Sequence, residues 1–315
     1  MDLMSILREE LPNIKQSTLT SYVRILEKIR SRNDGDKMFK FLKKNPQKVI
    51  DSLSEKPSTR KTQLVAVILM LKLLDAKDDI IKTYKDEQLR CIDSVNQFYK
   101  SGEKSEKQKE NWLTKSDLEG ILTEQEEVYN NIVNKTRGHV KAGKYLDAQN
   151  YVLLSFYMKY PLRNDLHDTK IVLPSSFNKL SKDKKLEYNY LVLPKQGQSK
   201  LVLNDYKTSK VYGQKIIEID QEITDLIRDF LKWRDLHGYP SNYLMINKDA
   251  QPMNSNNITK SFLRLFKRYN KSISTSMLRH IILTEMFSES NKLKEEIAHK
   301  IGNSPATIDK QYIKK

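Results

Sequence analysis

Cysteine is almost absent from this sequence of 315 residues, and that scarcity excludes two classes of structure. Cys91 is the only cysteine, so an intrachain disulfide framework is excluded, and a reducing interior is the natural environment. One cysteine and five scattered histidines also make a structural zinc site an unfavourable interpretation. We expect neither a structural metal nor any other cofactor.

Long hydrophobic runs are absent as well. The longest one, from Leu64 to Leu71, is far shorter than the roughly 18 residues that a membrane span requires. The first four residues lack the basic stretch and apolar segment of a secretory signal. A hydrophobic content of 38% with 30% charged residues is typical of a globular chain, here long enough for two domains. We therefore expect an intracellular protein without a membrane partner.

The charge is strongly unbalanced in the positive direction. The formal net charge is +16 and the pI is near 9.5, which favours a polyanionic partner such as nucleic acid. Residues 1–100 carry 20 Lys and Arg against 14 Asp and Glu, a net of +6, and the remaining residues carry 36 against 26, a net of +10. Positive charge on both parts predicts two domains that grip one DNA duplex.

The first hundred residues show helical periodicity. An apolar stripe at helical spacing follows Ser17, and Pro57 precedes a strongly apolar helix expected from Gln63 to Leu74. Residues 101–110 are polar with almost no apolar content, which predicts a linker over 101–112. A solvated extension of the preceding helix is the alternative.

The remainder of the chain, 113–315, mixes helices with a few short strands. An apolar-rich helix is expected from Tyr145 to Tyr160, ending at Pro161. Three short β-type runs follow at 188–193, 200–203 and 215–219, and helical spacing returns at 223–231 and 258–266. The predicted fold class is mainly α with a small antiparallel sheet.

Five short elements in this part occur in a particular order. Arg163 follows the end of a helix, Lys207 stands between the second and third β runs, and a Ser-x-x-Arg box begins at Ser276. They are followed by an Ile-Gly-Asn element and, nine residues later, by a tyrosine; the full set is Arg163, Lys207, Ser276, Arg279, Asn303 and Tyr312. In this order and spacing the segment resembles the catalytic domain of tyrosine recombinases, the phage-integrase family of site-specific DNA recombinases.

The resemblance implies a fold and a chemistry. Residues 1–100 would be a helical, SAM-like core-binding domain and 113–315 the domain that breaks and rejoins DNA. Tyr312 would attack a phosphodiester to form a 3′-phosphotyrosine, with Arg163 and Arg279 on the phosphate oxygens and Lys207 as general acid, without a metal ion. The partners implied are double-stranded DNA and further copies of the chain, as a dimer or tetramer on that DNA. The abundance of Lys, Asn and Ile points to an AT-rich source such as a mobile element or a large DNA virus.

Two positions depart from the family pattern. Ser276 stands where the box usually begins with His, and Asn303 stands where the second His or Trp is expected. Neither side chain titrates near neutral pH, but both can donate a hydrogen bond to a phosphate oxygen. Two assignments stay open, since His280 can serve as a base or only as a structural residue, and Lys210 is the alternative to Lys207.

Three other functions are compatible with the sequence. Residues 296–308 also resemble a helix-turn-helix, so a DNA-binding protein without catalysis, or a catalytically degenerate recombinase, is the main alternative. Type IB topoisomerases share the Arg-Lys-Arg-Tyr residues, although the separate helical N-terminal domain favours a recombinase. Telomere resolvases are a further variant.

Overall fold

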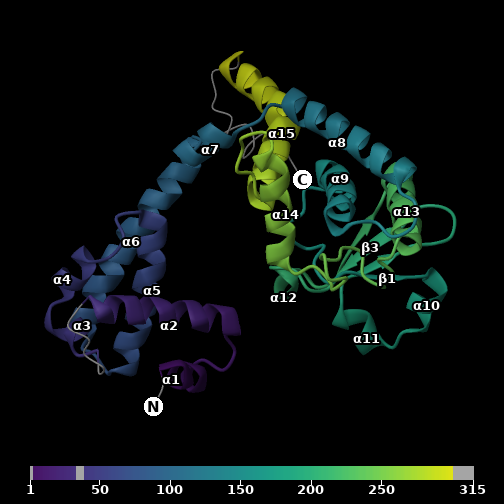
Figure 1. Ribbon diagram of the computed structural model, residues 1–315. Helices are drawn as coiled ribbons and strands as arrows, with labels where there is room; N and C mark the ends of the chain where they lie inside the picture. The colour runs from purple at the N-terminus through teal and green to yellow at the C-terminus, as the bar shows by residue number, and fades with distance from the viewer. Residues whose placement is uncertain (1–2, 33–38, 301–315) are drawn as a thin grey trace. The chain divides into compact units, whose positions relative to one another are not determined.

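The structure, a computed structural model, describes residues 3–32 and 39–300. The chain divides into two compact units, Met1–Lys104 and Ser105–Lys315. Within the described residues, no helix is both long and apolar enough to cross a membrane. The expected fold class, a mainly helical chain with one small sheet, is confirmed (Figure 1).

The first unit is helical throughout its described part. Its elements are α1 (Leu3–Glu10), α2 (Gln16–Ser31), α3 (Phe41–Lys44), α4 (Pro46–Asp51), α5 (Pro57–Leu73) and α6 (Asp78–Ser101).

Helix α5 is the centre of this unit, as its apolar sequence predicts. Pro57 occupies the first turn, where its missing N–H costs nothing, and the helix buries Leu64, Val67 and Leu71 against α2 and α6. The buried Tyr84 of α6 donates its hydroxyl to the Leu42 carbonyl oxygen at 2.9 Å, which ties α6 to α3. The result is a separate hydrophobic core in the first unit.

The segment expected to be a linker contains a short helix. Helix α6 ends at Gly102, whose φ of +68° suits a glycine, and α7 (Glu106–Asn111) starts at a capping box formed by Ser105 and Gln108. The Asn111 side chain accepts a hydrogen bond from the Ser272 backbone at 2.5 Å, so α7 is tied to the second unit. That unit begins at Ser105.

The second unit combines helices with a four-stranded sheet. After α7 its elements are α8 (Lys115–Lys135), α9 (Ala142–Lys159), β1 (Lys170–Val172), α10 (Pro174–Lys179), α11 (Lys182–Glu187), β2 (Tyr190–Val192), β3 (Lys200–Leu203), α12 (Ser209–Tyr212), β4 (Lys215–Glu218), α13 (Gln221–Leu236), α14 (Ser255–Lys267) and α15 (Thr275–Lys300).

The sheet differs from the expected antiparallel one by an additional strand. Its order is β1-β2-β3-β4, in which β2, β3 and β4 are antiparallel neighbours while β1 pairs with β2 in parallel. A parallel pair needs a crossover connection, and the segment with α10 and α11 supplies it between β1 and β2. The sheet is therefore mixed.

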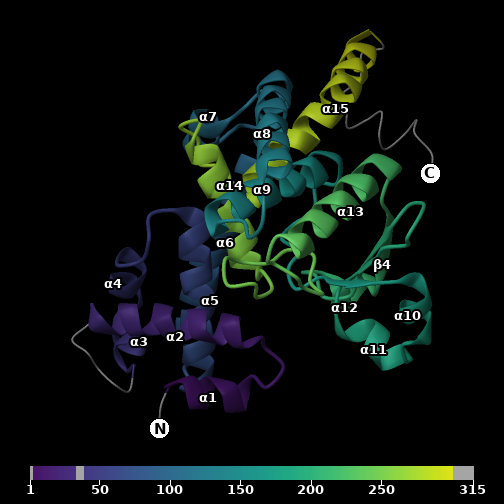
Figure 2. The ribbon, with the colours of Figure 1, turned by 45° about the vertical axis from the view of Figure 1, so that its right-hand side comes forward.

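Helix α9 forms the core of the second unit. It packs against α8, α13 and α14 (Figure 2), and nearly every residue from Tyr145 to Tyr157 is buried. The Tyr145 ring stacks on Tyr239 with 4.2 Å between centroids, and Tyr157 meets Phe262 edge-on at 5.0 Å. A helix buried over most of its length forms a rigid base for the segment that follows it, which carries Arg163.

Candidate active site

The segment after α9 holds Arg163 in place through its neighbours. The buried Tyr157 donates its hydroxyl to the Arg163 carbonyl oxygen at 2.5 Å. The next residue, Asn164, donates to the Thr259 hydroxyl of α14 at 2.9 Å and accepts from the Thr275 hydroxyl at the start of α15. The Arg163 segment is thus held by hydrogen bonds to three helices, while the Arg163 side chain is exposed.

The start of α15 presents the predicted Ser-x-x-Arg box. The Ser274 hydroxyl accepts a hydrogen bond from the Met277 backbone N–H at 3.3 Å and so caps the helix. Ser276 and Arg279 are three residues apart, which places them on one face of the first turn. Ser276 is exposed and Arg279 half-buried, so both can reach a ligand in solvent.

Asp165 is a buried carboxyl group two residues after Arg163. Burial raises the pKa of its carboxyl group, and this rise is opposed by a hydrogen bond from the Arg163 backbone and by the charges of Arg163, His167 and Arg279. Hydrogen bonds supply the structural link between the two arginines, because the side chain of Asn164, next to Arg163, accepts from Thr275 at the start of the helix that carries Arg279.

Lys207 lies on the connection between β3 and β4, as expected. The preceding residue, Tyr206, is buried, and its hydroxyl donates to the Gly213 carbonyl oxygen at 2.7 Å across the loop. The side chains of Lys207 and Lys210 are exposed, whereas the Lys215 ammonium group lies 4.9 Å from the Tyr206 ring centroid. The side-chain amide of Asn189 donates to the carbonyl oxygens of Asp205 at 3.0 Å and Asp165 at 2.9 Å, which joins this loop to the Arg163 segment.

Two of the predicted site residues, Asn303 and Tyr312, lie outside the described residues, as does most of the segment that resembles a helix-turn-helix. His280 is described and is exposed on α15 next to Arg279. Within residues 3–32 and 39–300, no three His, Cys, Asp or Glu side chains are grouped as metal ligands would be.

Several residues that organise the site were not singled out from the sequence. Asn164, Asp165 and Thr275 each lie within two residues of a predicted residue. Asn189 joins the Arg163 segment to the Lys207 loop by side-chain hydrogen bonds. A signal for Asn189 was present, because an amide at the start of an apolar β run needs buried partners.

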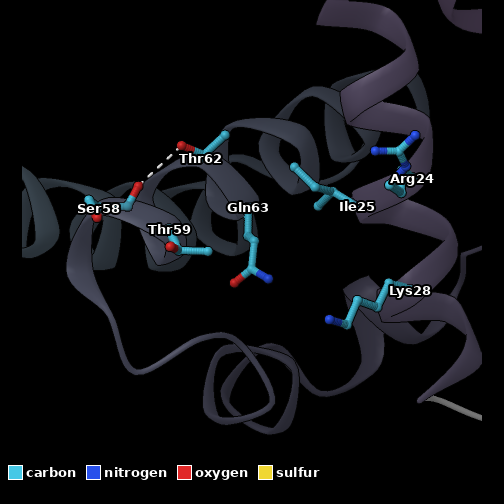
Figure 3. Close-up of a pocket in the computed structure, with 7 residues that line it drawn as sticks. All are labelled: Arg24, Ile25, Lys28, Ser58, Thr59, Thr62 and Gln63. Carbon is cyan, nitrogen blue, oxygen red and sulfur yellow. Dashed lines mark hydrogen bonds between the residues drawn. The ribbon is translucent and has the colours of Figure 1, made fainter. Parts of the chain in front are cut away.

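A second surface feature lies on the first unit (Figure 3). It is a pocket of about 350 Å³ between α2 and the first turns of α5. Its cations, Arg24 and Lys28, come from α2, and three hydroxyl side chains come from α5. No carboxylate lines the pocket, which is therefore basic; the full lining is Arg24, Ile25, Lys28, Ser58, Thr59, Thr62 and Gln63.

The model of the phage integrase family matches residues 195–313 of this chain. The matched part includes Lys207, Ser276, Arg279 and Tyr312, while Arg163 precedes it. No curated protein matches the chain. The similarity to this family therefore covers the C-terminal part of the second unit.

Solved structures of recombinases are similar to the chain over most of its length. The Tn1549 transposon integrase (residues 82–397), in complex with circular intermediate DNA, is 15% identical, with 99% of this chain and 95% of that chain covered and a TM-score of 0.42. The XerA recombinase is 12% identical, with 90% and 82% covered and a TM-score of 0.35. The XerH site-specific recombinase, bound to a palindromic difH substrate, is 15% identical, with 89% and 70% covered and a TM-score of 0.41.

Proposed function

We propose that this protein is a site-specific tyrosine recombinase that cuts and rejoins double-stranded DNA through a phosphotyrosine at Tyr312. The observation that carries the proposal is a set of hydrogen bonds that links the Arg163 segment to the start of α15, which carries Arg279, and to the Lys207 loop, within a chain whose residues 195–313 match the phage integrase family. Three segments far apart in the sequence supply the positive groups that phosphoryl transfer needs.

The arginines would bind the phosphate. A phosphodiester attacked by a phenolic oxygen gains negative charge on its non-bridging oxygens in the transition state. A guanidinium group stays protonated and can bind two of these oxygens at once, so Arg163 and Arg279 fit this role. By analogy with oxyanion holes, each preorganised donor lowers the barrier by about 3–4 kcal/mol.

Lys207 would supply the proton. As the Tyr312 oxygen forms its bond to phosphorus, the bond to the 5′ oxygen breaks, and that oxygen must be protonated to leave as a hydroxyl. An exposed ammonium group on the loop beside the arginines can provide this proton, with Lys210 as the alternative donor. The phenolic proton passes to a base, for which the exposed His280 is the candidate on α15. Because arginine and lysine supply the positive charge, we expect the reaction to proceed in EDTA.

Ser276 and Asn303 would act as hydrogen-bond donors to the phosphate, in place of the imidazoles usual in the family. The exposed position of Ser276, one helical turn before Arg279, supports this role. A neutral hydroxyl group makes a weaker hydrogen bond to a phosphate than a protonated imidazole does. We therefore expect slower chemistry and the same reaction.

The first unit would bind the duplex. Its basic pocket with Arg24 and Lys28 offers cations and hydroxyl groups to a backbone phosphate. The first hundred residues carry a net charge of +6, so binding by this unit adds to that of the second. Recombination joins two duplexes, and we expect the chain to act as a dimer or tetramer on DNA, inside the cell.

A binding protein without catalysis is the alternative. The observation that favours it is Ser276, since the loss of a titrating group at this position is also what a degenerate enzyme would show. Formation of a covalent protein–DNA adduct distinguishes the two.

The experiment uses a pool of duplexes with a randomised cleavage region and a nick beside it, so that the short 5′-hydroxyl fragment diffuses away after cleavage. Adducts that survive denaturation are isolated and their DNA is sequenced. We expect a defined sequence to be enriched by the unaltered protein. Non-covalent retention of DNA without any adduct would instead support the binding-only protein.

A further inference from the structure

Asn189 stands at the start of β2 and uses every hydrogen-bonding position of its side chain. Its amide group donates to the carbonyl oxygens of Asp165 at 2.9 Å and Asp205 at 3.0 Å. Its oxygen accepts from the backbone N–H groups of Asn204 at 2.8 Å and Asp205 at 2.9 Å. An amide has two donors and two lone pairs, so this buried side chain is fully satisfied.

The two segments that Asn189 joins are those that carry the candidate catalytic residues. Asp165 lies two residues after Arg163, and Asp205 lies two residues before Lys207. All four bonds are made to backbone atoms. They therefore fix the backbone of both segments and do not depend on the side-chain conformations of Asp165, Asn204 and Asp205. The last residue pair between β2 and β3 at this end is Tyr190 with Val202. Beyond it, the Asn189 side chain bonds the backbone N–H groups that follow β3.

The other described contact between the segments is weaker. His167 lies 3.4 Å from the Asp205 carboxylate, and the Asp205 side chain is 64% exposed. A pair at this distance with one partner largely exposed contributes little. Among the described residues, Asn189 therefore makes the principal hydrogen-bonded connection between the Arg163 segment and the Lys207 loop.

We propose that Asn189 is a positioning residue that holds the Lys207 loop at the correct distance from Arg163, so that the lysine meets the leaving oxygen of a phosphate held by the arginines. This inference rests on the proposed function. A general acid acts only within hydrogen-bond reach of the atom it protonates, and a displacement of about 1 Å can lower a rate about a hundredfold. Loss of Asn189 should thus reproduce, in weaker form, the loss of Lys207.

The test compares two buried amides of the same unit. Asn189→Ala removes the connection between the loops. Gln149→Ala is the matched control. The buried Gln149 side chain donates to the Ile246 carbonyl oxygen at 3.0 Å and accepts from the Ile246 backbone N–H at 3.0 Å. It forms no hydrogen bond to either of the two segments that Asn189 joins. Each variant is assayed for unfolding temperature, DNA affinity and adduct formation on the duplex that the unaltered protein selects.

The decisive readout is a substrate whose 5′ bridging oxygen is replaced by sulfur, a leaving group that needs no proton. Asn189→Ala should lose about a hundredfold in rate on the oxygen substrate and recover most of it on the sulfur substrate, as Lys207→Ala should. Gln149→Ala should keep the sulfur-to-oxygen rate ratio of the unaltered protein even if it is less stable.

The inference would be overturned if the unaltered protein forms the adduct and Asn189→Ala keeps its sulfur-to-oxygen rate ratio. That result would leave the proposed function intact. Absence of any adduct from the unaltered protein would instead overturn the proposed function. If Asn189→Ala fails to fold, Asn189→Asp retains the acceptor oxygens and loses the donors, and the same change of ratio is expected from it.

Discussion

At the scale of single residues, Asp165 is a buried acid, and its ionisation should cost stability. Burial raises its pKa above the ordinary value, so the folded state binds the proton more tightly than the unfolded state does. The stability that this group contributes is present below its unfolded pKa of about 3.9 and is lost as pH rises through the raised value.

Asp165→Asn should therefore stabilise the protein at pH 7 and give little or no gain at low pH. The asparagine oxygen can still accept the hydrogen bond from the Arg163 backbone, so the geometry is retained. Thermal unfolding measured across a pH series checks this. A gain of equal size at every pH would show that the carboxyl group does not titrate as described.

Ser276 tests whether the site tolerates the imidazole usual in the family. Because Ser276 is exposed in the first turn of α15, Ser276→His should fold normally and form the adduct as fast as the unaltered protein or faster. Ser290→His, at an exposed serine of the same helix, is the control for stability. If the site were built around the smaller group, crowding of about 1–3 kcal/mol would lower the rate instead.

At the scale of elements, Thr275 connects the beginning of α15 with the Arg163 segment. Its buried hydroxyl donates to Asn164, which in turn donates to Thr259 of α14. Thr275→Val keeps the shape and removes the donor, so the arginines on the two segments lose their shared support. We expect slower adduct formation with nearly unchanged DNA affinity. Thr224→Val, at another buried threonine, should affect stability without affecting the rate per folded molecule.

The sequence predicted helices and strands correctly where their pattern of apolar residues was long enough to recognise. Pro161 marks the end of α9, β3 spans the predicted 200–203, and helical spacing identified α13 and α14. Strand β1 was missed, because three residues give no alternation and its parallel partner lies twenty residues away.

Part of the candidate site could be predicted from the sequence, and part of it became apparent only in the structure. Arg163, Lys207 and Arg279 could be picked out by resemblance. Asn164 and Asn189 could not, because their roles consist of hydrogen bonds between segments that only the fold brings together.

At the scale of the whole molecule, the positive charge should appear as salt-dependent DNA binding. If both units contact the duplex, the logarithm of affinity should fall with the logarithm of salt concentration with a slope near −0.9 for each phosphate neutralised. The pocket of the first unit should account for part of that slope through Arg24 and Lys28.

Arg24→Ala and Lys28→Ala should each reduce the magnitude of the salt slope by about 1. Arg30→Ala is the control, since Arg30 lies on the same helix, is paired with Glu27 and does not line the pocket. Equal slopes for all three variants would mean that the pocket makes no phosphate contact.

The central claim is that Tyr312 forms a covalent bond to DNA, and the most direct measurement is denaturing electrophoresis of the protein after incubation with the selected nicked duplex. Tyr312→Phe removes a single oxygen and should bind DNA normally while giving no adduct. The unaltered protein should give an adduct whose peptide map places the nucleotide on Tyr312. An adduct of undiminished yield from Tyr312→Phe, or no adduct from the unaltered protein on any duplex of the pool, would contradict the account.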